Sequence, residues 1–176
     1  MKKTIYILLI IFGCLFLTGW APQLFAQMPE FNFNLDSTFV AVMNVKGNNI
    51  NGFETKVSYD PAFLQYLSYT IYPEKLGEYN SNPFEYRAVN DSVGFVEMML
   101  GCPLQGIIER VDNNIYEIGF QPVQSGTTFV KITKAIGYKS LSEACDVIEV
   151  ENPENRLFLN EFPIDKSTII FKLIFE

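Results

Sequence analysis

The chain has 176 residues and a formal net charge of −7, and it contains no histidine. Without histidine, Ser-His-Asp and Cys-His catalysis and the usual zinc hydrolase sites are excluded. The acidic balance repels phosphate backbones, so nucleic acid and anionic membrane surfaces are poor partners. Aromatic residues make up 15% of the chain, a composition that favours strands with one half-buried face.

Residues 1–26 have the pattern of a secretory signal peptide. Lys2 and Lys3 precede an apolar run, and the small residue Ala26 closes the segment. The run is too short for a stable membrane span. We therefore expect a mature domain at residues 27–176, secreted or held at the cell envelope. Cys14, after Ile-Phe-Gly, faintly resembles a lipoprotein cleavage site, so a lipid anchor at Cys14 is an alternative.

The mature part reads as a series of short strands. They are expected at residues 39–45, 53–59, 65–72, 84–90, 93–100, 114–122, 127–136, 146–150, 156–159 and 167–175. Residues 140–144 tolerate a single helical turn. The last strand is apolar on both faces except for Lys172, which places it in the middle of a sheet. Strands at this spacing, separated by Gly, Pro, Asn and Asp, predict an all-β antiparallel sandwich or barrel in a single domain.

The most informative stretch is the strand at 53–59 and the turn after it. Phe53, Val57 and Tyr59 alternate with polar residues, as in a strand with one face on a core and one in water. Asp60 and Pro61 then supply a hydrogen-bond acceptor and a fixed φ for a sharp turn.

This stretch carries a family resemblance. Gly52-Phe-x-x-x-Val-x-Tyr-Asp-Pro-x-x-Leu64 resembles the strand and corner of cohesin domains and of the neighbouring family 2/3 carbohydrate-binding modules. Residues 115–120 and 125–132 resemble the late strand pair of these domains. The resemblance, over residues 36–173, implies a nine-stranded antiparallel jelly-roll-like β-sandwich. It also implies non-catalytic binding, either of a dockerin, which is a small calcium-loaded helical module, or of polysaccharide.

In the cohesin reading, protein recognition occurs on one sheet face, built by the strands that correspond to residues 53–59, 84–90, 93–100 and 127–136. Strict alternation within these strands nominates the outward side chains. They are Glu54, Lys56, Ser58, Glu85, Arg87, Glu97, Lys131 and Thr133. An ordinary solvated face is the plainer reading of the same residues.

Tyrosines offer a second kind of binding surface. Tyr66, Tyr72 and Tyr79 are candidates for sugar binding, with Tyr66 and Tyr72 sharing the face opposite Tyr69 if the strand alternates. The only tryptophan, Trp20, lies in the signal peptide, which weakens the carbohydrate-binding reading. A structural or adhesion component of the envelope is a third possibility.

The remaining candidates for chemistry have simpler roles. Carboxylates for a glycosidase-like pair are Asp60, Glu97, Glu109 and Asp112, but nothing in the sequence sets a productive separation, so no enzyme is expected. Cys102 and Cys145 in an exported protein predict a disulfide, with two buried free thiols as the alternative. No cofactor and no metal site are expected, because no histidine is available to complete a thiol site.

Overall fold

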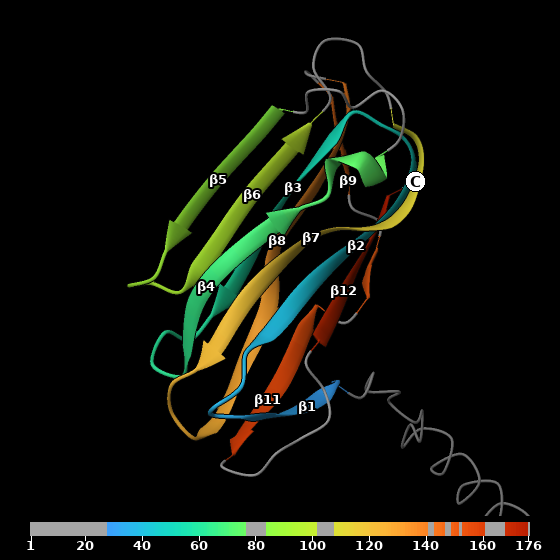
Figure 1. Cartoon of the computed structure of the whole chain (residues 1–176). Coiled ribbons are helices and arrows are strands. Elements are labelled where there is room, and N and C mark those ends of the chain that lie inside the picture. Colours follow the sequence, from blue (N-terminus) through green and yellow to red (C-terminus); the bar gives the residue numbers. More distant parts are fainter. Residues whose placement is uncertain are drawn as a thin grey trace, which may run out of the picture.

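The computed structural model describes residues 28–76, 84–101, 108–140, 143–146, 149–151, 153–160 and 168–175, which form two β-sheets packed face to face (Figure 1). The seven-stranded sheet follows the order β1 (Glu30–Asn34), β11 (Glu154–Asn160), β8 (Gly126–Ser140), β3 (Gly52–Tyr59), β6 (Phe95–Gly101) and β5 (Phe84–Asn90), with β9 (Glu143–Asp146) paired to β8. The five-stranded sheet follows the order β10 (Glu149–Glu151), β12 (Thr168–Phe175), β2 (Phe39–Ile50), β7 (Ile108–Pro122) and β4 (Leu64–Ile71).

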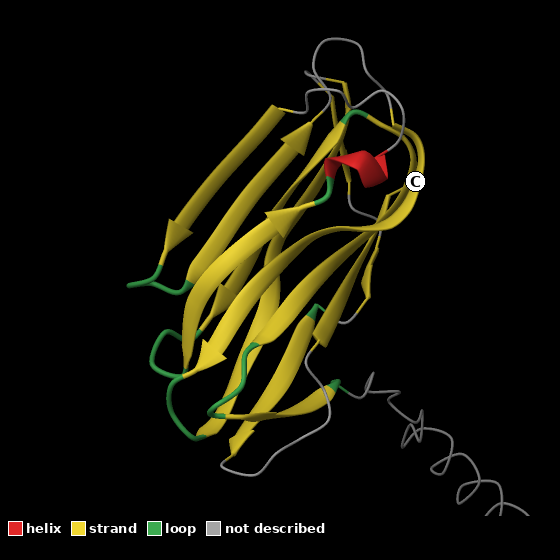
Figure 2. Cartoon of the chain, viewed as in Figure 1, coloured by secondary structure: helices red, strands yellow, loops and turns green. Residues whose placement is uncertain are grey.

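The predicted all-β sandwich is confirmed, with differences in detail. The described residues form twelve strands rather than nine, and two strand pairs, β1 with β11 and β12 with β2, are parallel rather than antiparallel. Figure 2 shows that strand dominates these residues, with one short helix, η1 (Pro73–Leu76). The single helical turn that residues 140–144 tolerate does not form at Ser140, Glu143 and Ala144, because these residues belong to β8 and β9 and the pairing of the two strands overrides the local tolerance for a turn. Residues 141–142 lie outside the described part.

The core lies between the sheets and is built by the expected alternation. The inward residues of β3, Phe53, Thr55, Val57 and Tyr59, are all buried. The predicted central position of the last strand is confirmed, since β12 lies between β10 and β2. At the middle of the core the Thr55 hydroxyl is hydrogen-bonded to the Tyr116 hydroxyl of β7, which ties the two sheets together. Burial raises the pKa of the Tyr116 phenol, so this group stays a neutral hydrogen-bonding partner.

The corner after β3 fixes the neighbouring hairpin. Asp60 Oδ1 accepts a hydrogen bond from the Ala62 amide at 2.9 Å, and the Asp60 carbonyl accepts from the Leu64 amide at 3.0 Å, so Leu64 folds back into the core. Gly94, in the β5–β6 turn, has a φ of 79°, and a Cβ there would meet the Tyr59 carbonyl oxygen at 2.1 Å. Only glycine therefore lets the β5–β6 turn close against the corner.

A candidate protein-binding face

The register of four neighbouring strands defines one continuous surface, which we call the outer face: the side of β8, β3, β6 and β5 that points away from the core. Because Phe53, Thr55 and Val57 are buried, Glu54, Lys56 and Ser58 point outward. Strand pairing extends this side across the sheet in rows. One row is Ile136, Glu54, Met99 and Tyr86, and the next is Lys134, Lys56, Glu97 and Ala88.

Glu54 lies at the centre of this face. A charged residue on the outward side of a strand is expected to be solvated, yet Glu54 is only 8% exposed. Lys134 donates to one of its carboxylate oxygens and Tyr138 donates to the other at 2.9 Å. Lys134 also lies 3.4 Å from Glu97 Oε1. Burial alone raises the pKa of the Glu54 carboxyl, but the hydrogen bonds from Lys134 and Tyr138 outweigh it and hold the pKa below its usual value. The centre of the outer face is thus a fixed, ionised network.

Glu85 and Arg87 do not lie on the outer face, so their predicted orientation is wrong. Glu85 pairs with the buried Leu100 and Arg87 with the buried Met98, which places both side chains on the inner side of β5. There they meet Tyr69 of β4: its hydroxyl donates to Glu85, and the Arg87 guanidinium lies 4.2 Å from the ring centroid. Burial and the hydrogen bond to Glu85 raise the pKa of Tyr69.

The error has a physical reason. β5 and β4 are the last strands of their sheets on the same side of the sandwich, where the core gives way to solvent (Figure 1). Charged side chains that point inward from an edge strand discourage pairing with other chains. The usual rule of apolar inside and polar outside is therefore reversed along β5.

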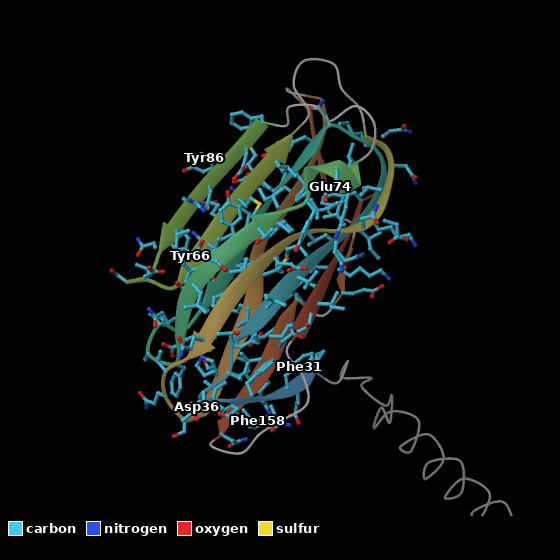
Figure 3. All side chains as sticks on the ribbon, viewed as in Figure 1. Phe31, Asp36, Tyr66, Glu74, Tyr86 and Phe158 are labelled. Carbon is cyan, nitrogen blue, oxygen red and sulfur yellow. The ribbon has the colours of Figure 1, made fainter. Side chains whose placement is uncertain are left out.

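The reversal turns aromatic residues outward. Phe84 is 56% exposed and Tyr86 is 50% exposed, and Tyr86 lies beside Met99 on β6. In Figure 3 Tyr86 lies at the β5 margin of the molecule. We call the outward, mostly apolar group at this end of the face the aromatic corner: Phe84, Tyr86, Met99, Ile136 and Tyr138. Sequence reasoning missed it, although the alternation of aromatic with charged residues from Phe84 to Arg87 carried the signal.

The other predicted residues do share the outer face. Lys56 and Lys134 are direct neighbours across β3 and β8, and the Lys56 ammonium lies 3.8 Å from the Phe95 ring centroid. Ser58 and Thr133 are joined by a hydroxyl–hydroxyl hydrogen bond of 3.0 Å, and Lys131 is exposed. Glu97 joins the Glu54 network through Lys134.

A surface pocket of about 410 Å³ continues the outer face at the end opposite the aromatic corner. It lies between the corner after β3, the β5–β6 turn and the start of β8. Its lining includes Ser58, Asp60, Val93, Thr127, Phe129 and Lys131. The face therefore combines an apolar end, a charged centre and a hollowed end.

The tyrosines proposed for sugar binding are not arranged as expected. A β-bulge between Tyr66 and Ser68 shifts the phase of β4, so Tyr66 and Tyr69 both point inward and pack on the core. Tyr72 points elsewhere and donates to Glu117 Oε2 at 3.1 Å. The expectation that Tyr66 and Tyr72 share a face opposite Tyr69 is wrong, and Tyr79 lies outside the described residues.

The remaining sequence candidates are dispersed. Asp60 caps the corner and Glu97 pairs with Lys134, while Asp112 lies on β7 of the other sheet. The side chain of Glu109 lies outside the described part, as do Cys102 and the side chain of Cys145, so the disulfide stays a prediction.

The signal peptide and Cys14 also lie outside the described part of the chain. Among the described residues, no three carboxylate or thiol side chains group together to hold a metal ion, and no helix has the length and hydrophobicity to span a membrane.

Two β-sheets packed face to face define the chain as a β-sandwich. The sequence matches the family model "Cohesin domain" over residues 37–148, and the chain belongs to the cohesin domain family. No curated protein sequence matches the chain.

Solved structures agree on the fold. The chain is similar to the cohesin module of a family 33 glycoside hydrolase from Clostridium perfringens, with a TM-score of 0.53 and 16% identity over 73% of this chain and 90% of that module. It is also similar to the sixth cohesin of scaffoldin B from Acetivibrio cellulolyticus, solved in complex with a Cel5 dockerin, with a TM-score of 0.52 and 16% identity over 75% of this chain and 95% of that one. At this identity the likeness concerns the fold alone.

Proposed function

We propose that residues 27–176 form an exported, non-catalytic cohesin module that binds a dockerin-type protein through the outer face. Membership of the cohesin family supports the binding role. The solved relative from Acetivibrio cellulolyticus was captured with a dockerin, which makes this class of partner the first to test. Export through residues 1–26 would place the module outside the cell or on its surface.

The observation that carries the proposal is the state of Glu54. A carboxylate on the outward side of a strand normally lies in water, yet Glu54 is nearly buried and is held by Lys134 and Tyr138. Fixing these side chains before a partner arrives lowers the entropic cost of binding. An ordinary solvated face has no need of such a network. Since Tyr66 packs on the core and Tyr72 is bonded to Glu117, these two described tyrosines do not support carbohydrate as a second candidate.

The first test is retention of proteins from the producing cell's secreted and envelope fractions on immobilised residues 27–176, with and without calcium. Mass spectrometry identifies the retained proteins, and each dockerin found is then titrated against the purified module. The expected result is a calcium-dependent dockerin. Retention of no dockerin under either condition would contradict the proposed partner class.

A charge reversal then locates the interface. Lys131→Glu on the outer face is expected to weaken dockerin binding about tenfold, the usual scale for one misplaced interface charge. Lys46→Glu is the matched control, since Lys46 is also exposed but lies on β2 of the other sheet. Equal weakening by both changes would contradict binding at the outer face.

A further inference from the structure

The starting observation is that β3 leaves its sheet while the neighbouring strand β8 continues. β3 pairs with β8 as far as Tyr59, which lies opposite Val130, and the chain then turns away at Asp60. Residues 126–129 of β8 pair with β11 on one side, but β3 no longer covers their other side. A gap about three residues or 10 Å long therefore lies in the sheet where β3 would have continued.

The backbone of β8 turns hydrogen-bonding groups toward this gap. The Ile132 amide donates to the Pro153 carbonyl at 2.7 Å, on the β11 side of the strand. Because these groups alternate from side to side along a strand, those of Thr127 and Phe129 point the other way, to the gap. Among the described residues, no hydrogen bond reaches the backbone of Thr127 or Phe129 from that side. Unpaired backbone groups at a strand edge are a template for a further strand.

The surface pocket of about 410 Å³ lies at this gap. Its lining combines residues of β8 with residues of the corner after β3 and of the β5–β6 turn: Thr127, Thr128, Phe129, Asp60, Pro61 and Val93. The volume falls within the range of small-ligand sites. Phe129 and Val93 supply apolar groups, and Thr127 is exposed, so the strand edge is open to solvent. We call the gap and its pocket the slot.

The corner end of the slot decides which part of a peptide fits. β3 itself closes the slot at Tyr59, so an added strand must begin or finish there. Antiparallel pairing with β8, the more stable arrangement, places the amino terminus of the added strand at the corner. Within the described residues the Asp60 carboxylate has no lysine or arginine at ion-pair distance, so it suits a terminal ammonium group. Lys131 suits a terminal carboxylate less, because Glu154 lies directly opposite it on β11.

We propose that the slot is a second binding site, which takes the amino terminus of an extended polypeptide as a short added strand. The first ligand residue pairs with the backbone of Phe129 and its ammonium group lies at Asp60, while the third residue pairs with the backbone of Thr127. The second residue points its N–H away from β8. This site goes beyond the proposed function, since it requires no dockerin and uses a strand edge instead of the outer face.

The test is an NMR titration of isotope-labelled residues 27–176 with tetrapeptide amides of the sequence X-Ala-Thr-Ala, in which X is Ala, Val, Leu or Phe. In the free protein the amides of Thr127 and Phe129 should exchange rapidly with solvent, whereas the Val130 amide, which points to β11, should exchange slowly. Peptide addition should shift the resonances of Thr127 and Phe129 and slow their exchange.

Modified peptides test the geometry from the ligand side. Acetylation of the amino terminus removes its charge and should weaken binding about tenfold, the scale of one charge-assisted hydrogen bond. N-methylation of the third residue removes its hydrogen bond to β8 and should also weaken binding about tenfold. N-methylation of the second residue is the matched control and should change the affinity less than about twofold.

Variants test the same contacts from the protein side. Asp60→Asn keeps the Oδ1 atom that accepts from the Ala62 amide and removes only the charge, so affinity should fall about tenfold while the corner stays intact. Thr127→Pro removes the N–H that faces the slot and leaves the pairing with β11, with Thr127→Ala as the matched control. Thermal unfolding verifies that each variant is folded. If Thr127→Pro is not, the N-methylated peptides test the same hydrogen bonds.

Three results overturn the inference. They are slow exchange of the Thr127 and Phe129 amides in the free protein, no shift of their resonances with any peptide at about 10 mM, and equal losses from N-methylation at the second and third residues. Equal affinity for free and acetylated peptides would refute the role of Asp60. A dockerin that binds the outer face while every peptide fails would refute the slot and leave the proposed function intact.

Discussion

β3 and β5 belong to the same sheet, and each contributes side chains to the outer face, yet they place their polar residues on opposite sides. In β3 the apolar residues and Thr55 face in and are buried, while the charged residues face out. In β5 the charged residues face in and the aromatic ones face out. The difference follows from position, because β3 lies inside its sheet with its inward residues buried from Phe53 to Tyr59, whereas β5 lies at the edge. Alternation tells which residues share a side, but the surroundings decide which side is buried.

The largest contrast between the two strands should appear in stability when an aromatic residue is removed from each. Phe53→Ala in β3 empties space beside Tyr116 and Phe175 and is expected to cost about 3–5 kcal/mol of unfolding free energy. Denaturant titration measures this value. A loss below about 1 kcal/mol would mean that the core closes around the gap, contrary to the close packing described for β3.

The hydrogen bond in the core should show the next largest effect. Thr55→Val removes the partner of the Tyr116 hydroxyl and leaves it buried without a bond, at a cost of about 1–3 kcal/mol. The double variant Thr55→Val/Tyr116→Phe removes both polar groups and should recover much of that loss. If the double variant is as unstable as the sum of the two single changes, the hydroxyls are not coupled.

Glu54 should make stability depend on pH. Its pKa is lowered in the folded protein, so the network stabilises the fold above the usual glutamate pKa of about 4.3 and this contribution disappears as the pH falls through the lower folded value. Glu54→Gln should cost about 1–2 kcal/mol at neutral pH and flatten the stability profile below about pH 5. An unchanged acid profile in this variant would show that other carboxylates govern the acid response.

The smallest effect is expected on the outward side of β5. Tyr86→Ser should change stability by less than about 0.5 kcal/mol, because half of the side chain is already in water. Arg87→Ala, which removes the contact with Tyr69, should cost about 0.5–1 kcal/mol. The same unfolding titration compares the two. If Tyr86→Ser is the more damaging change, the aromatic corner has a structural role.

The structural features that depend on a local sequence pattern could be predicted from the sequence. The strand at 53–59, its corner at Asp60 and the central last strand could be recognised because alternation, turn residues and a continuous apolar run report directly on backbone shape. The orientation of Glu85 and Arg87 could not be recognised from the sequence, because it depends on the edge position of β5 and on Tyr69 of a distant strand. The bulge after Tyr66 is equally invisible, since one extra residue reverses the phase and the glycine opposite it, Gly119, lies on a distant strand. The burial of Glu54 requires knowledge of Lys134 and Tyr138, 80 and 84 residues away in the chain.

The two parallel strand pairs have a mechanical consequence. The first described strand, β1, runs parallel to β11, and the last, β12, runs parallel to β2. Tension on the residues before Glu30 and after Phe175 that is directed along these strands slides the two members of each pair past one another. The evenly spaced hydrogen bonds of a parallel pair then share the load in shear and must rupture together instead of opening one after another. A parallel pair loaded in this way resists separation more strongly than a pair that opens one hydrogen bond at a time.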